Sequence, residues 1–364
     1  MRQMRSYDLG DPELDGRVEQ LVADASNNAH ADLIMEIITT ALKLHRDAPV
    51  RGDLKLVNTA LKEMRYSMLV FSRHEEPKVT IYGSARISED DPNYKLAEDF
   101  AAAMAKREWG VITGAGPGIM EAGSKGAGID NAYGVNIRLP FEANANRYLL
   151  PERTVNFKYF FTRKLAFVKE SHAFAIFPGG FGTLDETYEL LTLVQTGKSD
   201  MHPIVLLEAE GSGYWTRLLP AMEETLAESG YISASDLELF SLHHDAEAAA
   251  EELSNFYANY HSQRYVDGVL ILRLQQAPDP RTLAGLNADF ADIVVGDPME
   301  VIEATEAEKA DGDNVELARL AFRFNRRAFG RLRQLIDRLN DLVATPETVH
   351  PPAPMGEEQA ERPW

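Results

Sequence analysis

The stretch AIFPGGFGTLDE, residues 175–186, sets an apolar run directly before three closely spaced glycines, a threonine and two acids. This order is typical of a buried strand that turns sharply into a helix. Glycines let the backbone approach an anion closely, and the helix offers N–H groups at the positive end of its dipole. The stretch lacks the lysine of a P-loop and therefore predicts a site for a monophosphate. The residues expected to form it are Pro178, Gly179, Gly180, Gly182 and Thr183.

Thr183 and Glu186 allow two interpretations. In the first, the Thr183 hydroxyl binds the phosphate, and Glu186, on the same helical face, reaches the sugar attached to it. In the second, TLDE is a capping box, in which the threonine caps the helix and the glutamate bonds back to it. The three preceding glycines favour the first interpretation, because a cap requires none of them.

Residues 77–263 alternate between short apolar runs rich in Val and Ile and amphipathic helical stretches. This alternation predicts an α/β fold, with a doubly wound, Rossmann-like parallel sheet covered by helices on both faces. The runs expected to be strands are 79–85, 110–116, 132–139, 173–180 and 203–208. Ligands of such sheets bind at the carboxyl ends of the strands, where the strand order reverses.

The flanking segments predict further parts of the chain. Residues 1–76 are acidic and helical in pattern, whereas 264–343 predict a small α/β extension and 344–364 a disordered tail. Within the extension we expect strands at 268–274 and 291–297 and a long arginine-rich helix over 314–342. Its arginines could bind a polyphosphate nucleotide as an effector, but pairing with acids of this or a neighbouring subunit is the favoured alternative.

The composition narrows the range of functions. A formal net charge of -20 disfavours binding to nucleic acid or to an anionic membrane. The absence of cysteine excludes disulfides, thiolate catalysis and cysteine zinc sites, and the histidines show no metal-binding spacing. The beginning of the chain lacks an apolar signal core and no run is long enough to span a bilayer, so we expect a cytoplasmic protein.

Two other glycine-rich strand ends compete for the ligand site. They are Gly83-Ser84-Ala85-Arg86 and Gly114-Ala115-Gly116-Pro117-Gly118. The second has the spacing GxGxG rather than GxGxxG, and the strand that follows ends without an acid for a ribose diol, which disfavours NAD. A tight strand-to-helix turn is the alternative role of these glycines. Glu121 could face the cleft or simply favour the helix N-terminus through the dipole.

The aromatic stretch NFKYFFTRKLAFVKES, residues 156–171, precedes the glycine-rich strand. Its pattern predicts a buried stripe, and Arg163 and Lys164 by themselves predict ordinary surface charges. The residues expected in the stripe are Phe157, Phe160, Phe161, Leu165 and Val168.

PGGFGTLDE resembles the PGGxGTxxE signature of the LOG family, the cytokinin riboside 5′-monophosphate phosphoribohydrolases that are often mislabelled lysine decarboxylases. The pair Arg163 and Lys164 is similar to the second signature of this family, and YGSAR and TGAGPGIMEA look like its first two nucleotide loops. The resemblance covers roughly residues 77–260. The short family members lack the flanking segments, whereas larger nucleotide nucleosidases on the same core carry flanking domains.

The resemblance implies an N-glycosidase that splits a nucleoside 5′-monophosphate, such as AMP or a cytokinin riboside monophosphate, into base and ribose 5-phosphate. Arg163 and Glu186 would be the catalytic pair, and no metal or other cofactor is needed. The phosphate would lie on Gly179, Gly180, Gly182 and Thr183. Other substrate-binding residues implied by the matching loops and signatures are Gly83, Ser84, Gly114, Gly116, Gly118, Met120, Glu121, Lys164 and Pro178.

Three further expectations follow. Family members dimerise through helices beside the cleft, which implies a homodimer or a higher homo-oligomer. A nucleotide-binding sensor without turnover is the alternative function, although it would need neither Arg163 nor Glu186. Amino-acid decarboxylation would need a lysine that binds pyridoxal phosphate, and no lysine has a recognisable context for one.

Overall fold

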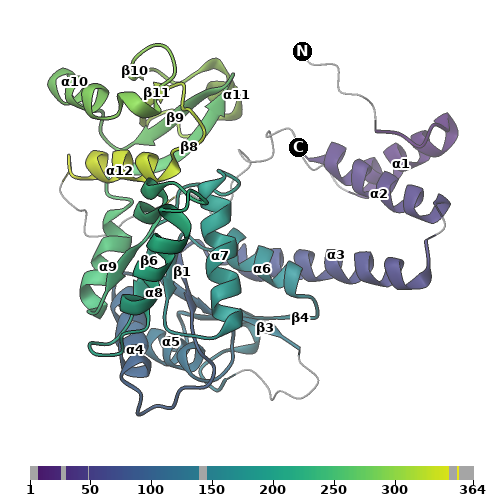
Figure 1. Ribbon diagram of the computed structural model, residues 1–364. Helices are drawn as coiled ribbons and strands as arrows, with labels where there is room; N and C mark the ends of the chain where they lie inside the picture. The colour runs from purple at the N-terminus through teal and green to yellow at the C-terminus, as the bar shows by residue number, and fades with distance from the viewer. Residues whose placement is uncertain (1–6, 26–29, 48, 139–145, 344–350, 352–364) are drawn as a thin grey trace. The chain divides into compact units, whose positions relative to one another are not determined.

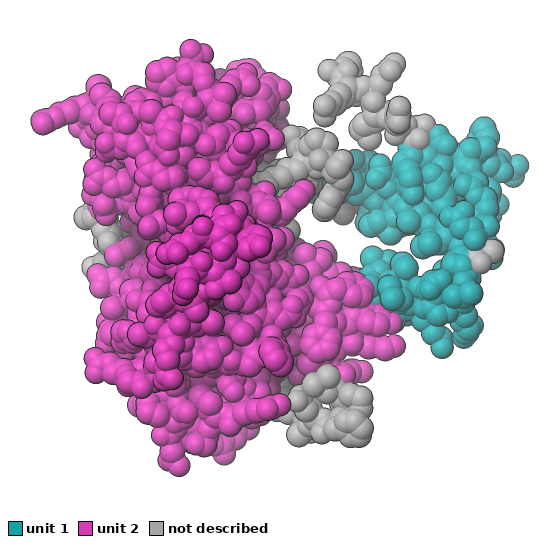
Figure 2. All heavy atoms as spheres, in the orientation of Figure 1, with its two compact units in different colours: residues 1–62 teal, residues 63–364 magenta. Residues whose placement is uncertain are grey.

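The computed structural model describes residues 7–25, 30–47, 49–138, 146–343 and 351. The chain divides into two compact units, residues 1–62 and 63–364 (Figure 2). The sequence-based borders at 76/77 and 263/264 both fall inside the second unit. The predicted disordered tail lies outside the described residues, apart from Pro351. No helix within the described ranges is both long and apolar enough to cross a membrane.

The second unit is built on a seven-stranded parallel sheet with the order β4-β3-β2-β1-β5-β6-β7 (Figure 1). This arrangement confirms the predicted doubly wound α/β fold. The strands are β1 (Lys78–Tyr82), β2 (Gly110–Thr113), β3 (Ala132–Ile137), β4 (Thr154–Phe157), β5 (Ala173–Ile176), β6 (Ile204–Leu207) and β7 (Ser241–His243). Strands β4 and β7 were not predicted from the sequence.

Helices cover both faces of this sheet. They are α4 (Pro92–Lys106), α5 (Ile119–Ala127), α6 (Phe160–Lys169), α7 (Phe181–Gln195), α8 (Trp215–Met222) and α9 (Ala246–Asn255). Helix α4 packs against α5 and α9, while α6 and α7 are joined by ion pairs. Because both faces are covered, every residue of β1, β2, β5 and β6 is buried.

The strand order reverses at β1. From β1 the chain proceeds outward through β2, β3 and β4, and it then returns to place β5 on the other side of β1. The loops after β1 and β5 therefore leave neighbouring strand ends in opposite directions. This is the position at which open parallel sheets form a ligand crevice.

The N-terminal region is helical, as predicted, and contains α1 (Pro12–Ala25), α2 (Ala31–Arg46) and α3 (Arg51–Phe71). The buried residues in the last part of α3 are Glu63, Ser67, Val70 and Phe71. Their spacing places them on one face of the helix. The ring of Phe71 packs on Tyr133 of β3 at a centroid distance of 5.6 Å, so this part of α3 belongs to the core of the second unit.

The C-terminal extension contains a four-stranded antiparallel sheet with the order β10-β11-β9-β8. Its elements are β8 (Tyr260–Val266), β9 (Val269–Leu274), α10 (Pro280–Asp289), β10 (Glu300–Ile302), α11 (Glu306–Asp311), β11 (Ala318–Phe322) and α12 (Phe329–Asn340). The remaining short helical turns of the chain are η1 (Pro151–Arg153), η2 (Glu223–Ala227), η3 (Ala234–Leu239) and η4 (Ala291–Ile293). Strand β8 spans the predicted border at 263/264.

Two predictions for this extension are wrong. The long helix over 314–342 is interrupted, because 318–322 pair with β9 as a strand and only 329–340 are helical. Asn314 and Arg326 adopt positive φ angles of 45° and 56°, which an α-helix does not accommodate. The strand expected at 291–297 is instead the turn η4 followed by a single bridge from Val294 to Phe324.

Several arginines of this extension have acidic partners within the chain. Buried Arg273 and Arg319 both bond to the carboxylate of buried Glu308. Arg331 pairs with Asp292, and Arg333 pairs with Asp337 and Glu252. These contacts favour intramolecular pairing of the arginines over the alternative, in which they bind a polyphosphate nucleotide.

Candidate functional site

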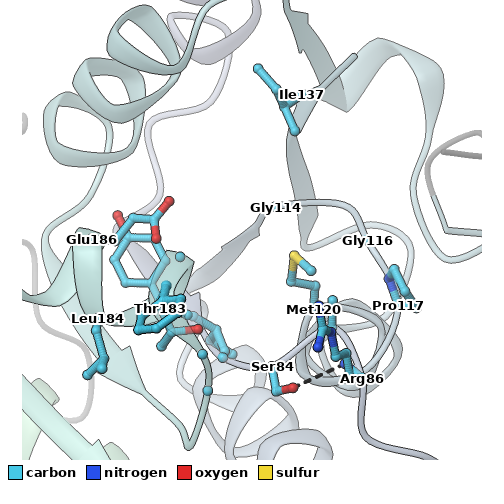
Figure 3. Close-up of a pocket in the computed structure, with 18 of the residues that line it drawn as sticks. Ser84, Arg86, Gly114, Gly116, Pro117, Met120, Ile137, Thr183, Leu184 and Glu186 are labelled. Carbon is cyan, nitrogen blue, oxygen red and sulfur yellow. Dashed lines mark hydrogen bonds between the residues drawn. The ribbon is translucent and has the colours of Figure 1, made fainter. Parts of the chain in front are cut away.

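A cavity of about 730 Å³ opens at the carboxyl ends of the central strands. The loops after β1, β2 and β5 line it, together with side chains from α6 and α7. In Figure 3, Thr183, Leu184 and Glu186 lie on one side, and Ser84, Arg86, Pro117 and Met120 lie on the other. The cavity therefore forms where the strand order predicts a ligand site.

The N-terminus of α7 faces this cavity without a cap of its own. Its N-cap residue is Gly180, no side chain caps it, and its first turn contains no acid. By contrast, α4, α9 and α10 are each capped by an aspartate. The first N–H groups of a helix have no carbonyl partner within the helix, so an anion can take the place of the missing cap.

Thr183 is not the helix cap that the capping-box interpretation required. The helix begins at Phe181, so Thr183 lies within the first turn, and its side chain is buried. A Cβ added to Gly179 would lie only 2.1 Å from the Thr183 hydroxyl oxygen. Glycine at 179 therefore allows that hydroxyl to lie directly against the loop.

Arg163 is buried, with 9% of its surface exposed, whereas its sequence alone predicted a surface charge. Its Nε donates to the carbonyl of Val135 at 2.8 Å, and Nη2 donates to the carbonyl of Gly114 at 3.3 Å. The guanidinium also lies 5.2 Å from the centre of the Phe167 ring. These contacts fix the cation at the ends of β2 and β3, on the wall of the cavity.

Glu186 lies one helical turn into α7 and contributes to the same cavity. Burial raises the pKa of Glu186 above its usual value, and the positive charge of Arg163 opposes the shift. Burial also raises the pKa of Tyr82, at the end of β1, and the negative charge of Glu186 adds to that rise. The site thus contains a partly desolvated carboxylate next to a fixed cation.

Lys164 does not line the cavity. Its ammonium group pairs with Asp185 at 2.9 Å and with Glu189 at 3.0 Å, both on α7. Partial burial would lower the pKa of Lys164, but the bonds to Asp185 and Glu189 outweigh it and the pKa is raised. The lysine therefore stays charged and ties α6 to α7. It follows Arg163 directly in the chain, and its two partners on α7 flank Glu186 in the sequence.

The glycines of the other two loops permit close packing. A Cβ on Gly114 would lie 2.4 Å from Arg163 Nη2, and one on Gly83 would lie 2.5 Å from the side chain of Ile119. Gly118 has a φ of 68°, and a Cβ there would lie 2.3 Å from the carbonyl oxygen of Ser84. The second loop also holds Ala115 at a φ of 64°, a strained conformation of the kind that gathers at functional sites.

Most of the residues predicted for the site line the cavity. They are Gly83, Ser84, Gly114, Gly116, Met120, Arg163, Gly179, Gly180, Gly182, Thr183 and Glu186. Four others do not line it, namely Gly118, Glu121, Lys164 and Pro178. Pro178 and Gly118 have backbone roles instead, since the Pro178 carbonyl accepts from Ser84 N at 3.0 Å and Gly118 is the N-cap of α5.

The sequence analysis missed several lining residues, which include Tyr82, Arg86, Asn136, Phe160, Phe167 and Phe181. Arg86 is exposed and adds a second cation to the wall. Its place at the end of the loop Gly83-Ser84-Ala85-Arg86 was the signal that could have identified it. The others carry no sequence signal that separates them from ordinary core or surface residues.

Two residues hold the segment from the end of β5 to α7 through its main-chain carbonyls. The Tyr214 hydroxyl donates to the Gly179 carbonyl at 2.7 Å, and Trp215 Nε1 donates to the Ile176 carbonyl at 3.1 Å. Both belong to the N-terminus of α8, which is held by buried Glu208 at the end of β6. Within the described ranges, no group of three or more potential metal ligands is present.

Replacing Gly179 by alanine should disturb this loop, because the new Cβ would lie 2.1 Å from the Thr183 hydroxyl oxygen. We expect Gly179→Ala to lower the unfolding midpoint and to weaken phosphate binding by roughly tenfold or more, comparable to the loss of a charge-assisted hydrogen bond. Calorimetric titration with inorganic phosphate and a thermal melt provide the two measurements.

Gly180→Ala is the matched control for stability, because a Cβ there meets no atom within 4 Å. Its unfolding midpoint should equal that of the wild type. A Gly179→Ala protein with unchanged stability and unchanged phosphate binding would contradict the packing described for Thr183.

Comparisons with known proteins agree with these features. Residues 114–253 match a family model described as "Possible lysine decarboxylase". A pyrimidine/purine nucleotide 5′-monophosphate nucleosidase of Escherichia coli K12 is 30% identical over 178 residues, which is 46% of this chain and 39% of that protein. The cytokinin riboside 5′-monophosphate phosphoribohydrolase LOG1 of Arabidopsis thaliana is 42% identical over 71 residues, 20% of this chain and 32% of that protein.

The chain thus spans less than half the length of either relative. Among solved structures, a molybdenum cofactor binding protein of Rippkaea orientalis is 20% identical, with a TM-score of 0.34, covering 49% of this chain and 95% of that one. The family match and the two named relatives, together with PGGFGTLDE at the start of α7, confirm the resemblance of this part of the chain to the LOG family.

Proposed function

We propose that the protein hydrolyses the N-glycosidic bond of a nucleoside 5′-monophosphate, releasing the free base and ribose 5-phosphate. The observation that carries this proposal is one cavity that combines the uncapped N-terminus of α7, the buried cation of Arg163 and the desolvated carboxylate of Glu186. The relatives named above act on such nucleotides and support the same reaction class.

The 5′-phosphate would bind at the N-terminus of α7. There it receives backbone N–H groups, the positive end of the helix dipole and the Thr183 hydroxyl. This contact lies away from the bond that breaks, so its binding energy can hold the ribose in a productive position.

The reaction at C1′ requires the C–N bonding pair to leave with the base, which places positive charge on the sugar. The carboxylate of Glu186 would stabilise that charge and accept a proton from the attacking water, whose oxygen forms the new bond to C1′. The departing base gains a proton. The nucleotide and one water molecule are thereby converted into the free base and ribose 5-phosphate. Arg163 would hold the Glu186 carboxylate and the substrate phosphate in place relative to each other.

The cavity suits either a purine or a pyrimidine base. Apolar side chains from several elements line it, including Met120, Ile137, Phe160 and Phe167. Such a wall can cover the faces of a base, although it offers few polar groups that would read its edge. We therefore propose the AMP or cytokinin riboside monophosphate type of substrate without restricting it to one base.

We further propose that the protein acts as a homodimer whose interface lies beside the cavity. Helices α6 and α7 expose apolar side chains there, with Phe181 at 94% and Phe160 and Phe161 each at 53% exposed. Phe160, Phe161 and Leu165 are three of the residues expected in a buried stripe, and that prediction is wrong for them. A cluster of exposed large apolar residues marks an interaction surface.

The proposed reaction is tested by incubating the full chain with AMP, GMP, CMP, UMP, IMP and a cytokinin riboside monophosphate, with adenosine as the control that lacks a phosphate. Chromatography should show free base and ribose 5-phosphate from at least one nucleotide and little product from adenosine. Glu186→Gln should lower kcat by between roughly 10²- and 10⁴-fold while nucleotide binding persists. Binding without cleavage by the wild type would instead support the sensor function.

The pH dependence should report the ionisation of Glu186. Activity requires the carboxylate, so kcat falls as the pH drops through the pKa of Glu186, and the midpoint should lie above the ordinary value of 4.5. Lys164 lowers this pKa and Asp185 raises it. Lys164→Gln should therefore move the acid limb to higher pH, and Asp185→Asn should move it to lower pH.

The substrate phosphate also titrates near pH 6, but it is the same in every variant, so differences between the profiles report the enzyme. Profiles of kcat at saturating nucleotide provide the measurement. Identical limbs in both variants would show that a group other than Glu186 controls the reaction.

The dimer is tested by sedimentation of Leu165→Glu, which places a charge on the exposed face of α6 outside the cavity lining. We expect the wild type to sediment as a dimer and Leu165→Glu to dissociate at least tenfold more readily, because a charge must be desolvated at the interface. Ile129→Glu, at another exposed apolar position, is the control and should stay dimeric. Equal behaviour of both variants would exclude this interface.

A further inference from the structure

The start of α6, the helix that carries Arg163, is held by a residue from α3. Tyr159 is the N-cap of α6, and its own side chain makes no capping bond. Glu63 accepts the backbone N–H of Lys158 at Oε1 and the hydroxyl of Thr162 at Oε2, each at 2.7 Å. A carboxylate 95 residues away from Lys158 in the chain thus joins the residue before the N-cap to the first turn of the helix.

Three features make this contact strong. Glu63 is only 9% exposed, so water competes little for its oxygens. A negative charge at a helix N-terminus is favoured by the helix dipole, and hydrogen bonds to an ionised group are stronger than neutral ones. The face of α3 formed by Glu63, Ser67, Val70 and Phe71 is buried, so the carboxylate is held by a packed helix.

The turn held by Glu63 is the one that positions Arg163. Thr162 immediately precedes Arg163, and the backbone N–H of Arg163 makes the helical bond to the Tyr159 carbonyl at 3.2 Å. Loss of the Glu63 contacts would loosen this first turn. Its loosening would shift the guanidinium relative to the Val135 and Gly114 carbonyls that hold it.

We propose that Glu63 is a positioning residue for the reaction, through which the last N-terminal helix sets the place of Arg163. This inference rests on the proposed nucleotide hydrolysis. It gives the N-terminal helical region a defined part in catalysis, because α3 contributes a charge without which the catalytic cation is less well held. Glu63 itself acts through α6 and contacts no substrate.

The test compares Glu63→Gln with Lys62→Gln, the exposed neighbour on the same helix. Glu63→Gln keeps the size of the side chain and removes its charge. We expect its kcat for the nucleotide that the wild type cleaves fastest to fall roughly tenfold or more, as small misplacements of catalytic groups do, while KM changes by less than about twofold. Lys62→Gln should match the wild type.

Two measurements separate positioning from a loss of folding. Hydrogen–deuterium exchange should speed up at the amides of residues 158–164 in Glu63→Gln while the strands β1 and β5 keep wild-type protection. Thr162→Val removes the hydroxyl that donates to Glu63 Oε2. The kcat of the double variant Glu63→Gln/Thr162→Val should be no lower than that of the slower single variant.

The outcomes are distinguishable. Wild-type kcat in a folded Glu63→Gln protein, or an equal loss in Lys62→Gln, would overturn the inference. A wild type that cleaves no nucleotide would overturn the proposed function instead. In that case the exchange experiment still decides whether Glu63 holds α6, and unchanged exchange at residues 158–164 would show that it does not.

Discussion

The buried guanidinium of Arg163 is the feature on which the rest of the site depends. Burying a cation is costly unless its N–H groups are hydrogen-bonded, and here main-chain carbonyls at the ends of β2 and β3 accept from it. The positive charge of Arg163 acts on Glu186, whose pKa it lowers against the effect of burial.

The position of Arg163 restricts which residues can lie next to it. Gly114 must lack a side chain, because a Cβ would occupy the space of Arg163 Nη2. Helix α6 must be held at both sides, and it is tied to α7 by Lys164 and to α3 by Glu63. Residues that touch no substrate thus fix the distance between the cation on α6 and the carboxylate on α7, and a desolvated carboxylate responds strongly to such a charge.

The sequence predicted the strands and the glycine-rich loops of the site because those signals are local. Apolar runs that end in glycine define strand ends, and the sheet topology then brings those ends together. Burial of Arg163 was not predictable in the same way, since its acceptors lie 28 and 49 residues away in the chain. The same limit applies to Glu63 and Tyr214, whose roles arise only from packing between distant elements.

The wrong predictions have physical causes as well. Apolar residues of 318–322 fit a helix or a strand, and pairing with β9 decides the outcome. The aromatic residues of α6 were expected to be buried because large apolar side chains usually are, yet Phe160, Phe161 and Leu165 are exposed beside the cavity. An apolar helix face that is exposed in the monomer is what an interaction surface produces. The spacing of apolar residues in the sequence is the same for such a face as for one that packs in the core.

The proposed anion site is compatible with a net charge of -20 because each charge acts over a limited range. The helix dipole of α7 acts within its first turn, and Arg163 and Arg86 lie on the cavity wall, so their field is strongest inside the pocket. Salt screens the surface acids over about 8 Å at physiological ionic strength. A small phosphate ester that enters the cavity therefore meets a positive environment, whereas a nucleic acid, too large to enter, meets the acidic surface. The overall charge and the local charge together select for a small anionic ligand.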